Sequence, residues 1–187
     1  HQAALKHQRH KAYEDFAAVG RDLISRGITS EQNLGVMGGS NGGLLTGVMM
    51  TRYPDLINAA LVSVPLLDMA RFHRLLAGAS WVGEYGDPEI PEELEYLLSY
   101  SPYHNIEAGE NYPVPLLTTS TYDDRVHPGH ARKFAHRLEQ LGHRFLYFEN
   151  LEGGHAGQTN PEQAARLQAI EYIYFLQRLA DAETDGQ

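Results

Sequence analysis

A serine between glycines is the first feature of this sequence that suggests chemistry. Ser40 lies at the centre of Gly38–Gly42, which matches the pattern Gly-x-Ser-x-Gly. The apolar residues 34–37 before it are typical of a short buried strand, and residues 41–52 after it have the pattern of a helix. A serine on a sharp strand-to-helix turn is exposed for nucleophilic attack, and flanking glycines relieve the crowding around it. The alternative is a glycine-rich helix start that Ser40 only caps.

A serine hydroxyl attacks a carbonyl only with the help of a base, which a third group orients. Asp123 and Asp124 follow the third apolar run of the sequence, and His155 follows the fourth. In α/β-hydrolases the residues occur in this order, Ser, Asp, His, each on a loop after a strand. The sequence therefore predicts a triad with Ser40 and His155, and its spacing does not decide between the two aspartates. The backbone N–H of Asn41 is expected to point toward the developing oxyanion.

The other histidines are weaker candidates for chemistry. His127 and His130 stand three residues apart near a helix start, with His136 further along. A metal site is conceivable from this spacing, but no acidic residue accompanies them at a motif distance, so we expect exposed helix positions. Three more histidines are expected to pack or to face solvent: His73, His104 and His143.

Alternating helical and strand-like segments must position these residues. Apolar residues at helical spacing predict four helices, at residues 12–26, 41–52, 128–141 and 161–176, the last with Asn160 as its N-cap. Apolar runs predict four strands, at residues 34–37, 59–64, 114–119 and 144–149. Because their apolar residues do not alternate with polar ones, we expect an α/β fold, with a mostly parallel sheet and helices on both faces. A helical insertion is expected over the strand ends, at about residues 68–103.

Composition narrows the functional classes. The 187 residues, 42% of them apolar and 21% charged, fit a soluble globular domain. A net charge of −9 argues against binding of nucleic acid, and no apolar run approaches the roughly 18 residues that span a bilayer. The absence of cysteine excludes disulfides, thiolate metal sites and cysteine nucleophiles. We expect neither a nucleic-acid nor a membrane partner, and a cytoplasmic location is favoured over a periplasmic one.

Four segments together resemble a known family, and the resemblance covers nearly the whole chain. The segments are Gly38–Leu45, parts of residues 67–86, Tyr122–Val126 and Gly153–His155. They are similar to the nucleophile motif, proline-pocket segment, acid loop and histidine loop of the prolyl oligopeptidase family. Its members are serine peptidases with an α/β-hydrolase domain and a β-propeller. The resemblance implies Ser40 as nucleophile, His155 as general base and acid, and Asp123 as the residue that orients His155, with Asp124 structural.

The resemblance also implies a pocket for a substrate proline. Trp81 would stack on the proline ring, and Tyr85, Val126 and Asn41 would complete the pocket. Arg125 would donate hydrogen bonds to the carbonyl before the proline. Without the resemblance, a half-buried core aromatic is favoured over a pocket residue for Trp81, and Arg125 is interpreted as a surface ion-pair partner of Asp123 or Asp124. The implied activity is cleavage of oligopeptides after proline through an acyl-enzyme, with no metal and no organic cofactor.

The family's hydrolase sheet has twice as many strands as the four predicted here. Residues 1–6 resemble the stretch just after its glycine-rich oxyanion loop, whose tyrosine is the second oxyanion donor, and no residue here takes that place. The chain is therefore expected to be the C-terminal part of the hydrolase domain, without the propeller. Its strand at 34–37 would then be an open apolar edge, which pairs with the missing N-terminal part or with a second copy.

Two alternative functions remain. One is another α/β-hydrolase activity, such as an acylaminoacyl peptidase or an esterase, for which Trp81 is not needed. The other is an inactive fragment that acts only in self-association through its open sheet edge.

Overall fold

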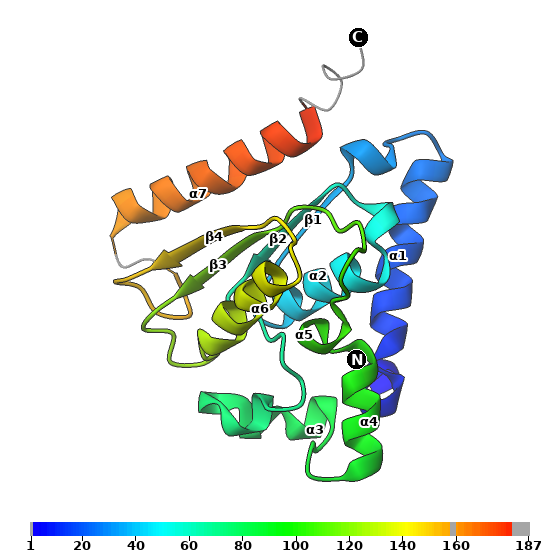
Figure 1. Cartoon of the computed structure of the whole chain (residues 1–187), viewed down its shortest axis with the longest axis vertical. Helices are drawn as coiled ribbons and strands as arrows, with labels where there is room; N and C mark the ends of the chain where they lie inside the picture. Colours follow the sequence, from blue (N-terminus) through cyan, green and yellow to red (C-terminus); the bar gives the residue numbers. More distant parts are fainter. Residues whose placement is uncertain (1, 158–159, 181–187) are drawn as a thin grey trace.

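A parallel four-stranded sheet forms the centre of the computed structural model, which describes residues 2–157 and 160–180 (Figure 1). The strands are β1 (Gly35–Gly39), β2 (Ala59–Ser63), β3 (Leu116–Ser120) and β4 (Leu146–Asn150). They lie side by side in the order β1-β2-β3-β4. The predicted parallel sheet is confirmed.

The strand bounds differ from the predicted ones by one or two residues. β1 continues to Gly39 because its backbone pairs with β2 as far as Ser63. β3 begins at Leu116 rather than at residue 114, since Pro115 has no N–H to donate to a neighbouring strand. The carbonyl of Pro115 accepts the N–H of Leu146 (2.8 Å), where β4 begins.

Seven α-helices surround the sheet in the described part of the chain. They are α1 (His10–Ser25), α2 (Asn41–Arg52), α3 (Val82–Tyr85), α4 (Pro91–Tyr100), α5 (Pro102–Asn105), α6 (Gly129–Gln140) and α7 (Pro161–Phe175). Six short 3-10 turns lie at Gln2–Ala4, Lys6–Gln8, Glu31–Asn33, Pro54–Leu56, Phe72–Arg74 and Leu76–Trp81, and a π turn follows α7 at Leu176–Ala180. The side chain of Asn160 accepts the N–H of Glu162 (2.9 Å), which makes Asn160 the N-cap of α7, as predicted.

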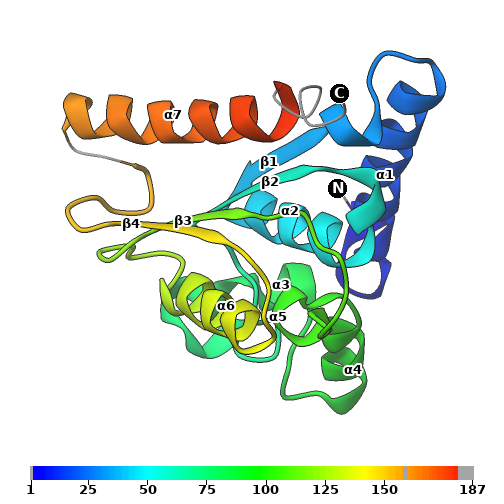
Figure 2. The same ribbon diagram turned by 45° about the horizontal axis from the view of Figure 1, so that its top comes forward.

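Helices cover both faces of the sheet. Figure 2 shows α7 on one face and α2 and α6 on the other, with α1 beside α2. Successive residues of a strand point to opposite faces. Accordingly Leu61 packs with Tyr174 of α7, whereas Val62 belongs to the cluster that contains Met49 of α2 and Phe134 of α6.

The segment between β2 and β3 carries three helices and its own apolar cluster. α3, α4 and α5 lie in the predicted insertion, although α5 ends at residue 105. Their cluster packs against α1 and α2 through the buried side chains Tyr13, Leu44, Phe72 and Tyr100. This packing places the end of α3 beside the start of α2, where the Gly-x-Ser-x-Gly turn lies.

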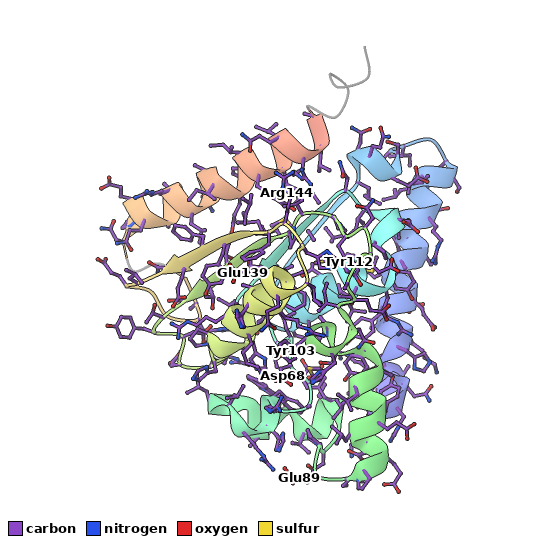
Figure 3. The ribbon with its side chains drawn as sticks, in the orientation of Figure 1. Asp68, Glu89, Tyr103, Tyr112, Glu139 and Arg144 are labelled. Atoms are coloured by element: carbon purple, nitrogen blue, oxygen red, sulfur yellow. The ribbon has the colours of Figure 1, made fainter. Side chains whose placement is uncertain are left out.

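Asp68 fastens the start of this segment to α6. Its carboxylate is buried and accepts hydrogen bonds from Lys133 of α6 and from Arg71 (3.2 Å). The ammonium of Lys133 also lies 4.5 Å from the ring centroid of Tyr103, in α5, so that Asp68 and Tyr103 share this cation (Figure 3). Burial raises the pKa of Asp68, but the hydrogen bond and charge of Lys133 outweigh it, so the pKa lies below its usual value.

β1 forms one edge of the sheet. The order of the strands gives it β2 as a neighbour on one side and no neighbour on the other among the described residues. Met37, in the middle of β1, is 63% exposed, and Phe16 and Val19 of α1 add exposed apolar surface. Among residues 2–157 and 160–180, no helix combines the length and the apolar character that crossing a bilayer requires. What covers this edge stays a prediction.

Candidate active site

The turn between β1 and α2 holds Ser40 in a conformation that few residues adopt. Its φ of 59° and ψ of −117° lie outside the regions favoured by side-chain-bearing residues. Two glycines allow the tight turn: a Cβ at Gly38 would collide with the backbone of Gly42, and one at Gly43 would lie 2.7 Å from the carbonyl oxygen of Ser63. The hydroxyl of Ser40 makes no capping hydrogen bond with α2. The side chain therefore does not act as a helix cap.

The loops after β3 and β4 bring Asp123 and His155 to this serine. Nε2 of His155 lies 3.1 Å from the Ser40 hydroxyl oxygen, and its Nδ1 lies 2.8 Å from Oδ2 of Asp123. Both separations are hydrogen-bond distances. Asp123 is buried, whereas Asp124 is exposed. The structure thus places the first aspartate, and not the second, against the histidine.

Hydrogen bonds hold the two loops together. The Ser120 hydroxyl at the end of β3 donates to the carbonyl of Gly153, and the N–H of Thr121 donates to the carbonyl of Asn150 (2.8 Å). Because β3 and β4 are adjacent and parallel, their carboxyl ends meet at one edge of the sheet. This pairing fixes the distance between the acid loop and the histidine loop.

Asn41 follows Ser40 in the chain and is the first residue of α2. The first N–H groups of a helix have no acceptor within the helix, so the N–H of Asn41 is available to an oxyanion. Its side-chain oxygen accepts hydrogen bonds from the Tyr85 hydroxyl (2.7 Å) and from the Arg9 guanidinium (2.5 Å). Burial raises the pKa of Tyr85, which keeps its hydroxyl protonated as a donor. Sequence reasoning missed Arg9, because it belongs to no motif.

The other residues of the predicted pocket come together next to the acid loop. Tyr85 and Val126 are buried in one apolar cluster, and the half-buried Trp81 packs against it. The N–H of Ala77 donates to the carbonyl of Arg125 (3.4 Å), which joins the turn that ends at Trp81 to the acid loop. The guanidinium of Arg125 is exposed and forms no ion pair within the described residues. The structure therefore brings Trp81, Tyr85, Arg125 and Val126 into one region, and the Tyr85 hydroxyl connects it to Asn41.

Comparison with known proteins identifies the family. The model of the prolyl oligopeptidase family matches residues 1–182. The chain belongs to the prolyl oligopeptidase family. An uncharacterized peptidase of Sinorhizobium fredii is 55% identical over 181 residues, and a prolyl endopeptidase of Elizabethkingia meningoseptica is 45% identical over 140. These matches cover 97% and 74% of the chain, but 25% and 20% of the relatives.

Solved structures of the prolyl oligopeptidase family have the same fold. The structure of a post-proline cleaving enzyme from Rickettsia typhi matches with a TM-score of 0.94 and 41% identity. The match covers 96% of this chain and 26% of that one. The chain thus spans about a quarter of the length of the proteins it matches, and within that quarter the α/β fold is confirmed.

The histidines of α6 in this family member differ in their exposure to solvent. The expectation that His130 is exposed is wrong: it is 1% exposed, and its Nδ1 accepts the backbone N–H groups of Leu67 (3.3 Å) and Asp68 (3.1 Å). Burial lowers the pKa of His130 to about 4. His136 is exposed on α6, as expected. Across residues 2–157 and 160–180, no three metal-ligating side chains are grouped so as to hold an ion.

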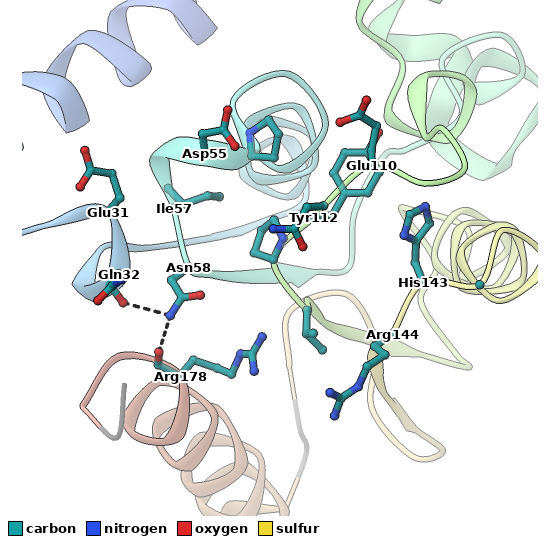
Figure 4. Close-up of a pocket in the computed structure, with 15 residues that line it drawn as sticks. Glu31, Gln32, Asp55, Ile57, Asn58, Glu110, Tyr112, His143, Arg144 and Arg178 are labelled. Carbon is teal, nitrogen blue, oxygen red and sulfur yellow. Dashed lines mark hydrogen bonds between the residues drawn. The ribbon is translucent and has the colours of Figure 1, made fainter. Parts of the chain in front are cut away.

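A cavity of about 520 Å³ lies at the opposite ends of the strands (Figure 4). Charged side chains of both signs line it, among them Glu31, Asp55 and Arg178. Asn58 closes one side by donating to the carbonyls of Gln32 (3.0 Å) and Arg178 (2.7 Å). None of the predicted site residues lines this cavity, so it is separate from the candidate site of this prolyl oligopeptidase family member.

Proposed function

We propose that this chain carries the catalytic residues of a serine peptidase that cleaves oligopeptides on the carboxyl side of proline. The observation that carries the proposal is the row of hydrogen bonds from Asp123 through His155 to Ser40. Ser-His-Asp rows of this geometry activate serine for acyl transfer on several unrelated folds.

In the proposed reaction, the Ser40 hydroxyl attacks the carbonyl carbon of the scissile peptide bond while Nε2 of His155 takes its proton. Asp123 holds the other ring nitrogen, which fixes the tautomer and stabilises the imidazolium. The backbone N–H of Asn41 donates to the oxyanion. His155 then protonates the leaving amine, and the C–N bond breaks to give an acyl-enzyme. Water hydrolyses this ester with His155 again as base, and Ser40 regains its proton.

The preference for proline rests on the surroundings of Trp81. A flat pyrrolidine ring suits an indole face, and the buried Tyr85 and Val126 supply further apolar walls. The exposed guanidinium of Arg125 is available to the carbonyl of the preceding residue. The prolyl endopeptidase and the post-proline cleaving enzyme among the relatives support the same choice of substrate.

The partner of the β1 edge is part of the proposal. The chain spans about a quarter of its relatives' length, and β1 has an unpaired outer side in the part of the chain that the structure describes. Unpaired edges are templates for another strand. We therefore expect β1 to pair with the N-terminal part of a longer protein or with a second copy. If pairing supplies a second oxyanion donor, turnover gains roughly 10²–10³.

The test compares matched chromogenic peptides that end in Gly-Pro or Gly-Ala before the leaving group, together with a short-chain ester. The proposal predicts hydrolysis of the proline peptide that Ser40→Ala abolishes. Trp81→Ala should lower its kcat/KM by about 10–100-fold, since stacking and apolar burial are both lost, and leave the ester within about threefold.

Two other outcomes would favour the alternatives. Equal hydrolysis of the alanine peptide and the ester would indicate a different hydrolase specificity, such as that of an acylaminoacyl peptidase or an esterase. A folded chain that hydrolyses none of these compounds, yet forms a stable complex with itself, would indicate an inactive module of self-association.

A further inference from the structure

A buried arginine, Arg9, contacts the residue that follows the candidate nucleophile Ser40. The side chain of Arg9, just before α1, is only 9% exposed. Its Nη2 donates to Oδ1 of Asn41 (2.5 Å), and its Nη1 lies 2.7 Å from Oε1 of Glu84. Its guanidinium carbon lies 5.1 Å from the ring centroid of Tyr85. The N-terminal segment, the start of α2 and the end of α3 therefore meet at one cation.

These contacts fix the orientation of the Asn41 amide. A guanidinium has donors but no acceptor, so the atom of the amide that faces Arg9 must be its oxygen. The Tyr85 hydroxyl donates to the same oxygen, which occupies its second lone pair. The amide NH2 therefore points away from Arg9. Asn41 is exposed, and its NH2 group donates to no residue within the described ranges.

We propose that Arg9 is a positioning residue, which orients the Asn41 amide so that its NH2 donates to a carbonyl oxygen of the bound peptide. Through the same contacts Arg9 holds the ring of Tyr85 as a wall of the proline pocket. The inference rests on the proposed function. It adds a residue that affects substrate specificity through its contacts with Asn41 and Tyr85. Arg9 itself makes no contact with substrate.

The shape of the arginine side chain matters to this role. Its planar fork donates to Asn41 and Glu84 from two different nitrogens, and its face lies over an aromatic ring. A lysine keeps the charge but offers a single ammonium. A methionine of similar length keeps the packing and loses every donor. Arg9→Lys is therefore a partial rescue, and Arg9→Met removes the hydrogen bond to Asn41 together with the ion pair to Glu84 and the cation over the Tyr85 ring.

The test measures covalent labelling of Ser40 by two phosphonylating probes. One is a small alkyl fluorophosphonate with nothing to place in the pocket, and the other is a diaryl phosphonate built on a pyrrolidine ring. Arg9→Met should lower the labelling rate of the pyrrolidine probe by about tenfold more than that of the alkyl probe, since hydrogen bonds to charged donors have effects of this size. Arg9→Lys should recover part of the loss. The control Lys6→Met, which removes the cation paired with Glu93 in the same segment, should change neither rate.

Two outcomes would overturn the inference. One is an undiminished rate with both probes in Arg9→Met; the other is an equal loss with both probes together with a lowered Tm, which indicates a structural role only. If the unaltered chain reacts with neither probe, the proposed function fails by itself. The contact is then decided by the ¹⁵N side-chain signal of Asn41, assigned with Asn41→Ser. Arg9→Met must shift that signal, and an unchanged signal contradicts the inference.

Discussion

Asp123 divides its two carboxylate oxygens between His155 and its own loop. Oδ2 lies 2.8 Å from Nδ1 of His155, while Oδ1 accepts the backbone N–H groups of Arg125 (2.9 Å) and Val126 (2.8 Å). The backbone of the loop therefore fixes the orientation of the carboxylate independently of the histidine. Because a carboxylate only accepts, Oδ2 of Asp123 selects the imidazole that carries a hydrogen on Nδ1, which leaves Nε2 free to accept from Ser40.

This division predicts the effect of Asp123→Asn. The two backbone N–H groups will hold the amide oxygen, which turns the NH2 group toward His155. Nδ1 must then accept, Nε2 carries the proton, and His155 cannot take a proton from Ser40. We expect kcat to fall by about 10⁴, as in other triads with the wrong tautomer. The measurement is peptide hydrolysis at pH 7, with Asp124→Asn as the matched control. A comparable loss in the control would contradict the assignment.

The glycines of the nucleophile turn predict a contrast between neighbouring positions. Gly38→Ala places a methyl group against the backbone of Gly42, so we expect a loss of about 1–3 kcal/mol in the free energy of unfolding and loss of labelling at Ser40. Gly42→Ala points into open space within α2, where alanine is the better helix former. Its stability should be equal or higher. Urea unfolding of both variants checks this, and equal losses would argue against the turn geometry.

His130 predicts a pH dependence of stability. Its pKa is lowered to about 4 in the folded protein, below the usual 6.5, because burial disfavours the charged form. The unfolded chain therefore binds the proton first, and stability falls as the pH drops from about 6.5 toward 4. The contribution should be about 2 kcal/mol smaller at pH 5 than at pH 7.

A variant isolates this contribution from the other titrating groups. In His130→Asn the amide oxygen can accept the same two backbone N–H groups, and nothing at that position titrates. Urea unfolding at pH 5 and pH 7 should show a smaller difference in the variant than in the unaltered protein. An identical pH dependence in the two proteins would be inconsistent with a buried, neutral His130.

The β1 edge predicts self-association or binding to a further strand. Met37 is exposed on this edge, so Met37→Lys removes no core packing and places a charge where another strand would pair. Light scattering over a range of concentrations should show association in the unaltered chain and less of it in the variant. A chain that remains strictly monomeric throughout would show that this edge does not recruit a second copy.

Much of the fold follows from local pattern, and the exceptions have physical causes. Apolar runs located the strands to within two residues, and Pro115 explains the late start of β3. The order of Ser40, Asp123 and His155 along the chain predicts that they lie close together, because parallel strands end at one edge of a sheet. In the structure His155 is within hydrogen-bond distance of both Ser40 and Asp123. Spacing does not separate Asp123 from Asp124, since only the path of the loop decides which carboxylate turns inward.

The misses are His130 and Arg9. His130 stands four residues before Phe134 on the buried face of α6, where it accepts backbone N–H groups of the segment after β2. The helical spacing of residues 130, 134 and 138 indicates this burial, and the expectation of an exposed position overlooked it. Arg9 contacts Asn41 of α2 and Tyr85 of α3, which are 32 and 76 positions further along the chain, so only the tertiary packing brings the three residues together. The one signal in the sequence is that Arg9 stands four residues before Tyr13 and eight before Ala17, which are buried on one face of α1.

The central claim is that Ser40, His155 and Asp123 form a working nucleophile in this chain. It is tested most directly by incubating the folded protein with an alkyl fluorophosphonate, followed by intact mass measurement and site mapping, with Ser40→Ala beside it. We predict one adduct per chain, located on Ser40 and absent from the variant. A folded chain without an adduct, or an adduct that persists in Ser40→Ala, would contradict the claim.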